Sequence, residues 1–461
     1  MQWRWFLWLV AAELVAQQLH WGVALGGIGS VGISGAAAML SNPAGLCAQA
    51  TRWELSLPAA WLRLEGLQLS EYAFYFGGVE TPQGWQRRRL SLSERNELMQ
   101  LLETHGLEAQ LLLQMVGVTY RLDSAAVVGV AASSVGHARL RPPRGTVQAL
   151  QQEPIGTTPV RLEDGEGTVR AYSVLTAAYG RRLRWGRPGE FTWGASEVDF
   201  GVALHLYRGH AYWEELPGSS LQLEPVLPVG WDSTPSWNVS GSLRWRSAEA
   251  AAGWLGYATG VAPTVGWGGA VSLGLRLRWY GSDSLESVLE LGAAVEQLGA
   301  ISWRLTEAAL ELANDTVRGV LGTAWEEVRQ RFTPRRRELQ RWEATPMALR
   351  FGAQARLTEW LHLPLNAYAE IALLTDMAWR TLQLASGAAL QLTPPFRWLP
   401  TAALGMRWQS ATPVHLSAGL RWSFAAHGRL QVELLWNALD GWLRFLSARR
   451  AGIGVRCTLR F

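Results

Sequence analysis

The last ten residues of the chain alternate strictly between two kinds of side chain. One set is apolar and the other is small, polar or basic: Ile453, Val455, Cys457, Leu459 and Phe461 against Gly452, Gly454, Arg456, Thr458 and Arg460. Successive side chains of a strand point to opposite faces, so this segment has one unbroken apolar face. Such a strand needs an apolar environment on one side and neighbours with the same pattern.

The same alternation recurs along the chain, most clearly in the segments 198–207, 237–246, 271–280, 349–357, 404–409 and 414–424. Weaker patterns lie at 168–183 and 388–393, and a strand pair is predicted at 111–121 and 125–138. Two earlier strands, the first with Trp53 and Trp61 on one face and the second with Phe74, and the closing segment bring the count to about 14. The sequence therefore predicts an all-β fold, a transmembrane antiparallel β-barrel with helical loop insertions. A soluble β-sandwich also alternates, so alternation alone does not separate the two folds.

The number and placement of the tryptophans favour the barrel over the sandwich. The chain has 26 tryptophans in 461 residues, and membrane interfaces favour this side chain, with its ring in lipid and its N–H near water. Trp237 and Trp245 lie about 27 Å apart along one predicted strand. When the strand is tilted by about 40°, their difference in height is about 20 Å, which is close to the height of the apolar band of outer-membrane barrels. Arg-Trp pairs at other strand ends place tryptophan outward and arginine inward. The predicted membrane girdle consists of Trp237, Trp245, Trp279, Trp408 and Trp422.

The N-terminus predicts export. Arg4 precedes an apolar run from Phe6 to Ala16, which is too short to span a membrane and fits a signal peptide. We expect a signal peptide over residues 1–24, with cleavage after Ala16 or Ala24, then a plug over 25–50 and a barrel over 51–461.

Two sequence features resemble known families. The closing segment resembles the last strand of bacterial outer-membrane barrels, which implies Phe461 as an assembly signal read by the barrel assembly machinery, and outer-membrane lipid as a partner. The segment that ends in Asn42, Pro43 and Ala44 is similar to the N-terminal lumenal plug of FadL-type hydrophobe transporters and of related type IX secretion barrels. The acidic pair of that family is replaced here by alanines. A capped helix predicted over 91–106 resembles an uncharacterised Bacteroidetes-type family of FadL-like barrels.

Arginine lines the predicted polar faces. The lumen-facing basic candidates are Arg244, Arg276, Arg278, Arg350, Arg356, Arg407 and Arg421. Two interpretations stay open: a salt-bridged network that fills the barrel and holds the plug, or a site that captures an anionic head group, which arginine binds through two parallel hydrogen bonds.

Several classes of function are disfavoured. The spacing of the histidines and of the two cysteines predicts no metal site and no cofactor. A bridge between Cys47 and Cys457 stays open. Arginine is scattered rather than clustered, which disfavours nucleic acid as a partner. His205 and His415 have serines nearby, but polar lumen residues are expected anyway, so we predict no enzyme.

The resemblance implies passive transport of hydrophobic or amphipathic small molecules, with a hydrophobic ligand. The alternative is a non-transporting scaffold for secretion or surface attachment of proteins, whose protein partner is unknown. Three long insertions, 142–167, 208–236 and 306–345, predict extracellular loops, the last with a helix over 316–332.

Overall fold

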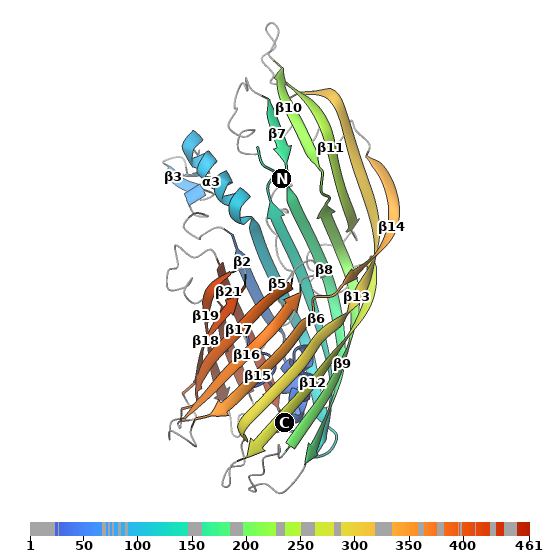
Figure 1. Ribbon diagram of the computed structural model, residues 1–461. Helices are drawn as coiled ribbons and strands as arrows, with labels where there is room; N and C mark the ends of the chain where they lie inside the picture. The colour runs from blue at the N-terminus through green and yellow to red at the C-terminus, as the bar shows by residue number, and fades with distance from the viewer. Residues whose placement is uncertain are drawn as a thin grey trace.

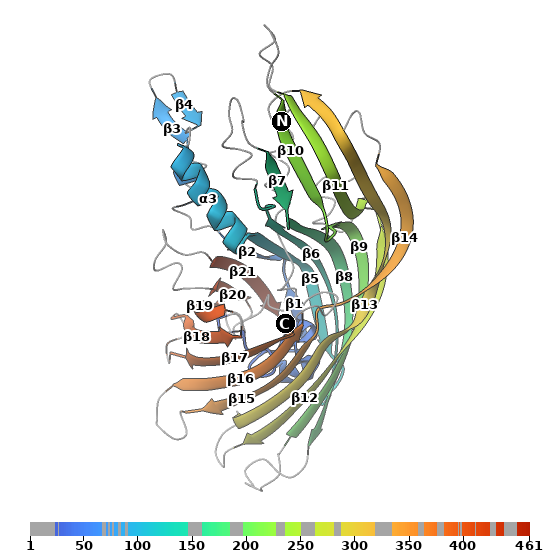
Figure 2. The same ribbon diagram turned by 45° about the horizontal axis from the view of Figure 1, so that its top comes forward.

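In the computed structural model, fourteen strand positions in the described part of the chain close into one antiparallel barrel (Figure 1, Figure 2). The structure describes residues 24–25, 27–66, 71, 74–75, 78–81, 84–87, 91–145, 159–184, 197–226, 236–249, 263–280, 287–318, 334–357, 364–375, 382–394, 396, 399–410, 412–424, 430–437 and 450–461. The barrel positions are taken in order by β1 (Trp53–Ser56) with β2 (Ala59–Glu65), β5 (Leu107–Arg121), β6 (Ala126–Arg141), β8 (Glu166–Arg184), β9 (Glu197–Glu215), β12 (Gly266–Tyr280), β13 (Ser287–Arg318), β15 (Ala348–Arg356), β16 (Leu365–Thr375), β17 (Leu382–Leu392), β18 (Thr401–Gln409), β19 (Thr412–Phe424), β20 (Leu430–Asn437) and β21 (Arg450–Arg460). The predicted strand count is confirmed.

The last strand closes the barrel against the first. β21 pairs with β20 on one edge and with β1 and β2 on the other. Phe461 and Trp53 complete the seam, because each backbone N–H donates to the other carbonyl at 3.0 Å. Ile453 and Val455 are exposed on the outside, whereas Arg456 is buried inside, as the alternation predicts.

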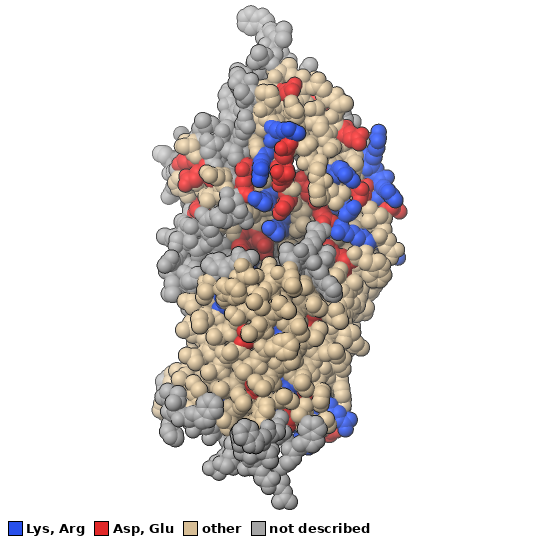
Figure 3. All heavy atoms as spheres, in the orientation of Figure 1, with Lys and Arg blue, Asp and Glu red and all other residues tan. Residues whose placement is uncertain are grey.

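Apolar side chains cover the outside of the barrel wall. Leu204 and Leu273 are 58% and 53% exposed, whereas Asp199 and Arg276, on inward positions of the same two strands, are buried. So much exposed apolar surface would be costly in water, so lipid is the environment that fits it. Charged side chains gather above this band and leave the middle of the visible face nearly uncharged (Figure 3). No helix among the described residues is long and apolar enough to cross a membrane.

The wall rises above the barrel on one side only. Four strands extend it together with the upper part of β13 (Figure 1). They are β7 (Val160–Glu163), β10 (Ser220–Val226), β11 (Ser236–Glu249) and β14 (Arg335–Ala344). Long connections gather at this end and short turns such as 122–125 at the other, so we call it the extracellular end. The helix predicted over 316–332 is wrong at its start, since 316–318 belong to β13, and 319–332 lie outside the described residues.

These four strands and the upper part of β13, the upper sheet, have an apolar cluster of their own. Trp237 is 6% exposed and packs with the apolar side chains of β7, β10 and β13, and Trp245 packs against the same cluster. The predicted girdle position is therefore wrong for Trp237, whose indole is covered by protein, and Trp245 lies above the apolar band with it. The other three girdle candidates, Trp279, Trp408 and Trp422, lie on outward positions of β12, β18 and β19.

The first barrel strand is interrupted at Leu57 and Pro58, between β1 and β2. Three residues there face two on β21, so the register shifts by one. A bulge of this kind reverses which side chains face inward. Trp53 consequently points outward and Trp61 is buried inside, although simple alternation puts them on one face.

Helices are few among the described residues. α3 (Leu92–His105) begins at Ser91, whose side chain and Glu94 form the predicted capping box, and ends at Gly106. Phe74 is helical, so the second predicted early strand is wrong there; a short hairpin, β3 (Gly78–Thr81) and β4 (Gly84–Arg87), follows.

The first described residues of the chain lie inside the barrel. We call residues 24–25 and 27–49 the lumenal segment; it contains the 3₁₀ helices η2 (Gly35–Leu40) and η3 (Pro43–Ala48) and is almost entirely buried. It occupies the end of the lumen opposite the upper sheet (Figure 2). Of the predicted signal peptide, residues 1–23 lie outside the described residues, and Ala24 is buried in the lumen.

Candidate functional site

A buried carboxylate of the barrel wall fixes the lumenal segment at Ser30. One oxygen of Glu370, on β16, accepts the backbone N–H groups of Gly29 and Ser30, each at 2.8 Å, and the Ser30 hydroxyl at 2.6 Å. The other oxygen accepts Arg350 Nη1 at 2.7 Å, and the same nitrogen donates to the carbonyl of Gly27 at 2.9 Å. Side chains of the barrel wall thus satisfy the backbone N–H groups of Gly29 and Ser30 and the carbonyl of Gly27.

Arg350 lies between two carboxylates at a place that water hardly reaches. Its Nε is 2.8 Å from Glu296 Oε1, and the side chains of Arg350, Glu296 and Glu370 are all buried. Arg407 lies against Gly27 of the segment. Buried charges cost free energy unless they are paired, so removing one member of this set would strand the others.

Two further arginines of the wall donate to backbone carbonyls of the segment. Arg276, on β12, donates to Ser30 O at 3.3 Å and to Ile33 O at 2.5 Å. Arg182, on β8, donates to Cys47 O at 2.5 Å. The segment is therefore held at both of its ends and at its middle by charged side chains from different strands.

The Asn-Pro turn joins the two halves of the segment and presses it against the wall. Asn42 Oδ1 accepts the N–H of Ala44 at 3.1 Å, which caps η3, and Pro43 takes the first helical position. Asn42 Nδ2 donates to Ser30 O at 2.7 Å and to Leu275 O, on β12, at 3.3 Å. Asn42, Pro43 and Ala44 thus form one structural unit.

Glycine makes room for this turn in the wall. A Cβ on Gly274 of β12 would overlap Asn42 Oδ1, and a Cβ on Gly201 of β9 would overlap the backbone of Pro43. The two glycines are paired in register. The turn can approach the strand backbone only because these inward positions carry no side chain.

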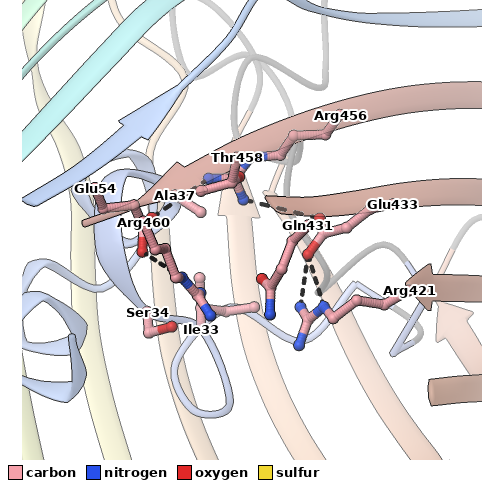
Figure 4. Close-up of a pocket in the computed structure, with 10 residues that line it drawn as sticks. All are labelled: Ile33, Ser34, Ala37, Glu54, Arg421, Gln431, Glu433, Arg456, Thr458 and Arg460. Atoms are coloured by element: carbon pink, nitrogen blue, oxygen red, sulfur yellow. Dashed lines mark hydrogen bonds and ion pairs between the residues drawn. The ribbon is translucent and has the colours of Figure 1, made fainter. Parts of the chain in front are cut away.

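A polar recess lies between the lumenal segment and the closing strands (Figure 4). Glu54, on β1, accepts the N–H of Ala36 at 3.1 Å and Arg460 Nε at 3.1 Å. Arg421 donates to Glu433 at 2.8 Å. The recess is lined by Ile33, Ser34, Ala37, Glu54, Arg421, Gln431, Glu433, Arg456, Thr458 and Arg460.

The predicted basic candidates occupy three different places in the structure. Arg276, Arg278, Arg350, Arg407 and Arg421 occupy inward positions of the barrel. Arg244 lies in the upper sheet, where its side chain is 48% exposed and 3.6 Å from Glu307. Its assignment to the lumen is wrong, because β11 runs above the barrel. Arg356 is the last residue of β15, at the end opposite the upper sheet, and is partly exposed.

The polar residues considered for other chemistry are engaged elsewhere. His205 is buried and bonded to the hydroxyls of Thr176 and Ser272, at 2.9 and 2.8 Å, rather than to a carboxylate. Cys47 and Cys457 are not bonded to each other. Burial, with Asp199 nearby, raises the pKa of the Cys47 thiol to about 12. Within the described ranges no three His, Cys, Asp or Glu side chains gather as metal ligands.

A second buried ion pair joins a barrel strand to the lower end of β14 in the upper sheet. Arg170, on β8, donates through two nitrogens to Glu343, on β14, at 3.1 and 3.0 Å, and its guanidinium lies 3.6 Å from the centre of the Tyr212 ring. β8 and β14 are not paired with each other in the sheet, so the contact joins separated strands through the interior. The packed rings of Tyr212 and Trp303 fill the space beside it.

These observations define a class: a β-barrel with a lipid-facing exterior, whose lumen holds its own N-terminal segment. No model of a known protein family matches the chain, and no curated protein matches its sequence. Among solved structures, it is similar to the toluene transporter TbuX of Ralstonia pickettii, with 11% identity and a TM-score of 0.50 over 98% of this chain and 99% of that one. It is similar also to the toluene transporter TodX of P. putida, with 12% identity and a TM-score of 0.50 over 98% and 99%.

The chain therefore has the fold of the FadL-type hydrophobe transporters and is a barrel of the bacterial outer membrane. Likeness at this identity concerns the fold alone. The resemblance to a Bacteroidetes-type family stays a prediction.

Sequence reasoning missed Glu54 and Ser30 as residues of this site. The sequence does contain a signal for Glu54. It is the only acidic residue of a strand whose other face is turned to lipid, so its side chain has to point into the barrel. Ser30 carried none, because its role follows from the fold of a glycine-rich coil.

Proposed function

We propose that the protein transports hydrophobic or amphipathic small molecules passively across the outer membrane, and that the lumenal segment acts as a plug. The observation that carries this proposal is the way the segment is held. Its backbone is hydrogen-bonded to side chains of the wall, those of Glu370, Arg350 and Arg276, and none of its described residues forms a strand of the sheet.

Such contacts suit a plug that has to leave its position in the lumen and return to it. A segment hydrogen-bonded to the wall as an additional strand could leave only by breaking a cooperative ladder. Individual side-chain contacts can exchange for water one at a time, since each is worth only about 1 to 3 kcal/mol net. The likeness in fold to two toluene transporters supports hydrophobic cargo.

The test is to lock the segment reversibly. A Cβ on Gly180 of β8 would lie 3.1 Å from Cys47 Sγ, close to the roughly 3 Å between Cβ and the opposite sulfur of a disulfide. Gly180→Cys in a Cys457→Ser background should therefore bond to Cys47. We expect cells with the oxidised variant to take up radiolabelled toluene and oleate much more slowly than the parent, and a reductant to restore the rate.

The matched control is the same variant with Cys47→Ser, which has a cysteine at Gly180 and no partner. It should respond to neither oxidant nor reductant. If the unlocked barrel takes up neither compound above the level of cells without it, transport of these cargoes is wrong. Undiminished uptake by a fully bonded barrel would show instead that the segment is not the gate.

One observation favours the alternative, a scaffold for protein secretion or surface attachment. The upper sheet extends well beyond the barrel and ends in β14, which among the described strands pairs only with β13 and so presents a free edge. An exposed edge can accept a strand from a partner. Pull-down with the intact barrel, compared with a variant that carries proline at Gln340 of β14, would reveal such a partner.

A further inference from the structure

A row of interfacial side chains crosses four neighbouring strands on the outside of the barrel, at the upper edge of the apolar band. The row consists, in register, of Arg208 on β9, Trp267 on β12, Ser302 on β13 and Trp342 on β14. These positions face outward, because the adjacent Tyr207 and Trp303 are buried inside. The two tryptophans are 52% and 68% exposed.

The height of the row fits the outer membrane interface. Trp267 lies twelve residues from Trp279 on the same face of β12, or about 30 Å in height at about 3.3 Å per residue and a tilt of about 40°. That separation is close to the thickness of an apolar band between two aromatic girdles. Trp267 and Trp342 thus lie at the level of the outer-leaflet head groups.

Two exposed arginines lie above this row on the same outer face. Arg304 is exposed on β13 opposite Gln340, whose amide donates to Ser302 at 2.7 Å and so lies over the row. Arg336 is exposed farther up β14. In the described part of the chain neither arginine has an ion pair, although Glu338 lies between them along the same face. Arg208, at the end of the row, donates to Thr264.

We propose that this outer-rim patch, made of Trp267, Ser302, Arg304, Arg336 and Trp342, binds a phosphate-bearing glycolipid of the outer leaflet. The acyl chains would lie along the apolar wall below. The tryptophan rings would contact the sugar and glycerol level, where such rings are favoured. Arg304 and Arg336 would donate to phosphate oxygens, which the guanidinium fork matches in geometry and charge.

The charge and the height together favour a lipid over a protein. Arginines that only contact water need no exposed tryptophans directly below them on the same face. A protein partner would not require the patch to end at the height where the apolar band begins. The surface is also continuous with lipid-facing side chains such as Leu273 and Leu298, which are both exposed. This proposal depends on the outer-membrane location and not on the transport function.

The test uses the full barrel in mixed micelles that contain bis-phosphorylated lipid A. Native mass spectrometry should show one retained lipid A on the parent protein. Dephosphorylated lipid A should be retained about thirtyfold less, and so should the phosphorylated form on the Arg304→Gln/Arg336→Gln variant, because each of the two arginines near a charged lipid surface contributes about 1 kcal/mol.

The control is Arg52→Gln, which removes an exposed arginine at the opposite end of the barrel. It should retain lipid A like the parent, and the heat-dependent electrophoretic shift of each variant shows that the barrel is folded. Equal retention of phosphorylated and dephosphorylated lipid A, or full retention by the double variant, would overturn the proposal. So would a parent protein that retains no lipid A at all.

Discussion

β11 and β12 have nearly the same sequence pattern and lie in different environments. β11 contains Leu-Arg-Trp-Arg at 243–246, and β12 contains Leu-Arg-Leu-Arg-Trp at 275–279. In β12 the arginines are buried against the lumenal segment and carboxylates of the wall, and the apolar side faces lipid. In β11 Arg244 is half exposed, and the apolar side is buried in a protein cluster. Alternation identifies two faces of a strand; height along the barrel axis decides what covers them.

The largest effect that would test this contrast is expected from Arg350→Ala. The substitution leaves Glu296 and Glu370 buried without their shared cation, which costs about 3 to 5 kcal/mol when one partner of a buried pair is removed. We expect the lumenal segment to be displaced and the barrel to conduct ions in planar bilayers.

Arg244→Ala in the upper sheet is the matched control. Its side chain is half exposed to water, and Glu307 keeps a second pair with Arg246. Its loss should therefore leave conductance and stability nearly unchanged, as measured for surface pairs. Similar conductance in both variants would mean that the lumenal and upper arginines do not differ in the way proposed here.

The next effect concerns the apolar cluster above the membrane. Trp237→Ala should open a cavity among Val160, Leu223 and Leu312 and destabilise the upper sheet by about 3 kcal/mol or more. Limited proteolysis should then cut the upper sheet faster while the barrel keeps its heat-dependent electrophoretic shift. Trp408→Ala, which removes an exposed, outward-facing ring of β18, should not change the cleavage rate. Equal cleavage of the two variants would contradict the burial of Trp237.

A smaller effect is expected inside the wall from Gly274→Val. The new side chain meets Asn42 Oδ1, and overpacking of this kind costs about 1 to 3 kcal/mol. Conductance should rise less than in Arg350→Ala. Gly269→Val is the control on the outer face of the same strand, where the nearest atom to the new Cβ is 3.6 Å away. A rise in both variants would point to a general weakening of β12.

The smallest expected effect is a change in the rate at which maleimide labels Cys47. The pKa of the Cys47 thiol is raised to about 12, chiefly by burial, and only the thiolate reacts with maleimide. In a Cys457→Ser background, labelling at neutral pH should be slow and should rise about tenfold per pH unit, because the thiolate fraction does so below the pKa. Arg350→Ala should accelerate it by exposing the segment. Fast labelling of the parent at neutral pH would contradict a buried Cys47.

Local patterns predicted much of this molecule, and their failures have physical causes. The capping box of Ser91 and Glu94 formed because it needs only neighbouring residues. Trp61 was placed on the wrong face because a one-residue bulge at Leu57 and Pro58 reverses the alternation without a strong sequence signal. The helix over 316–332 failed at its start because pairing with β11 extends β13.

The candidate site was predicted in part. Asn42, Pro43 and Ala44 were found through a family resemblance, and Arg276 and Arg350 through the alternation of their strands. The resemblance could not show that Gly274 makes room for Asn42, because that contact joins residues more than 230 positions apart.

Alternation along each strand was enough to predict a barrel with an apolar outside and arginines inside, because a side-chain period of two is a local property. Which arginines contact the lumenal segment, which tryptophans face lipid and where β11 lies relative to the membrane follow only from the folded arrangement of the strands. Those outcomes depend on strand height and register, which are set by pairing between strands distant in the chain.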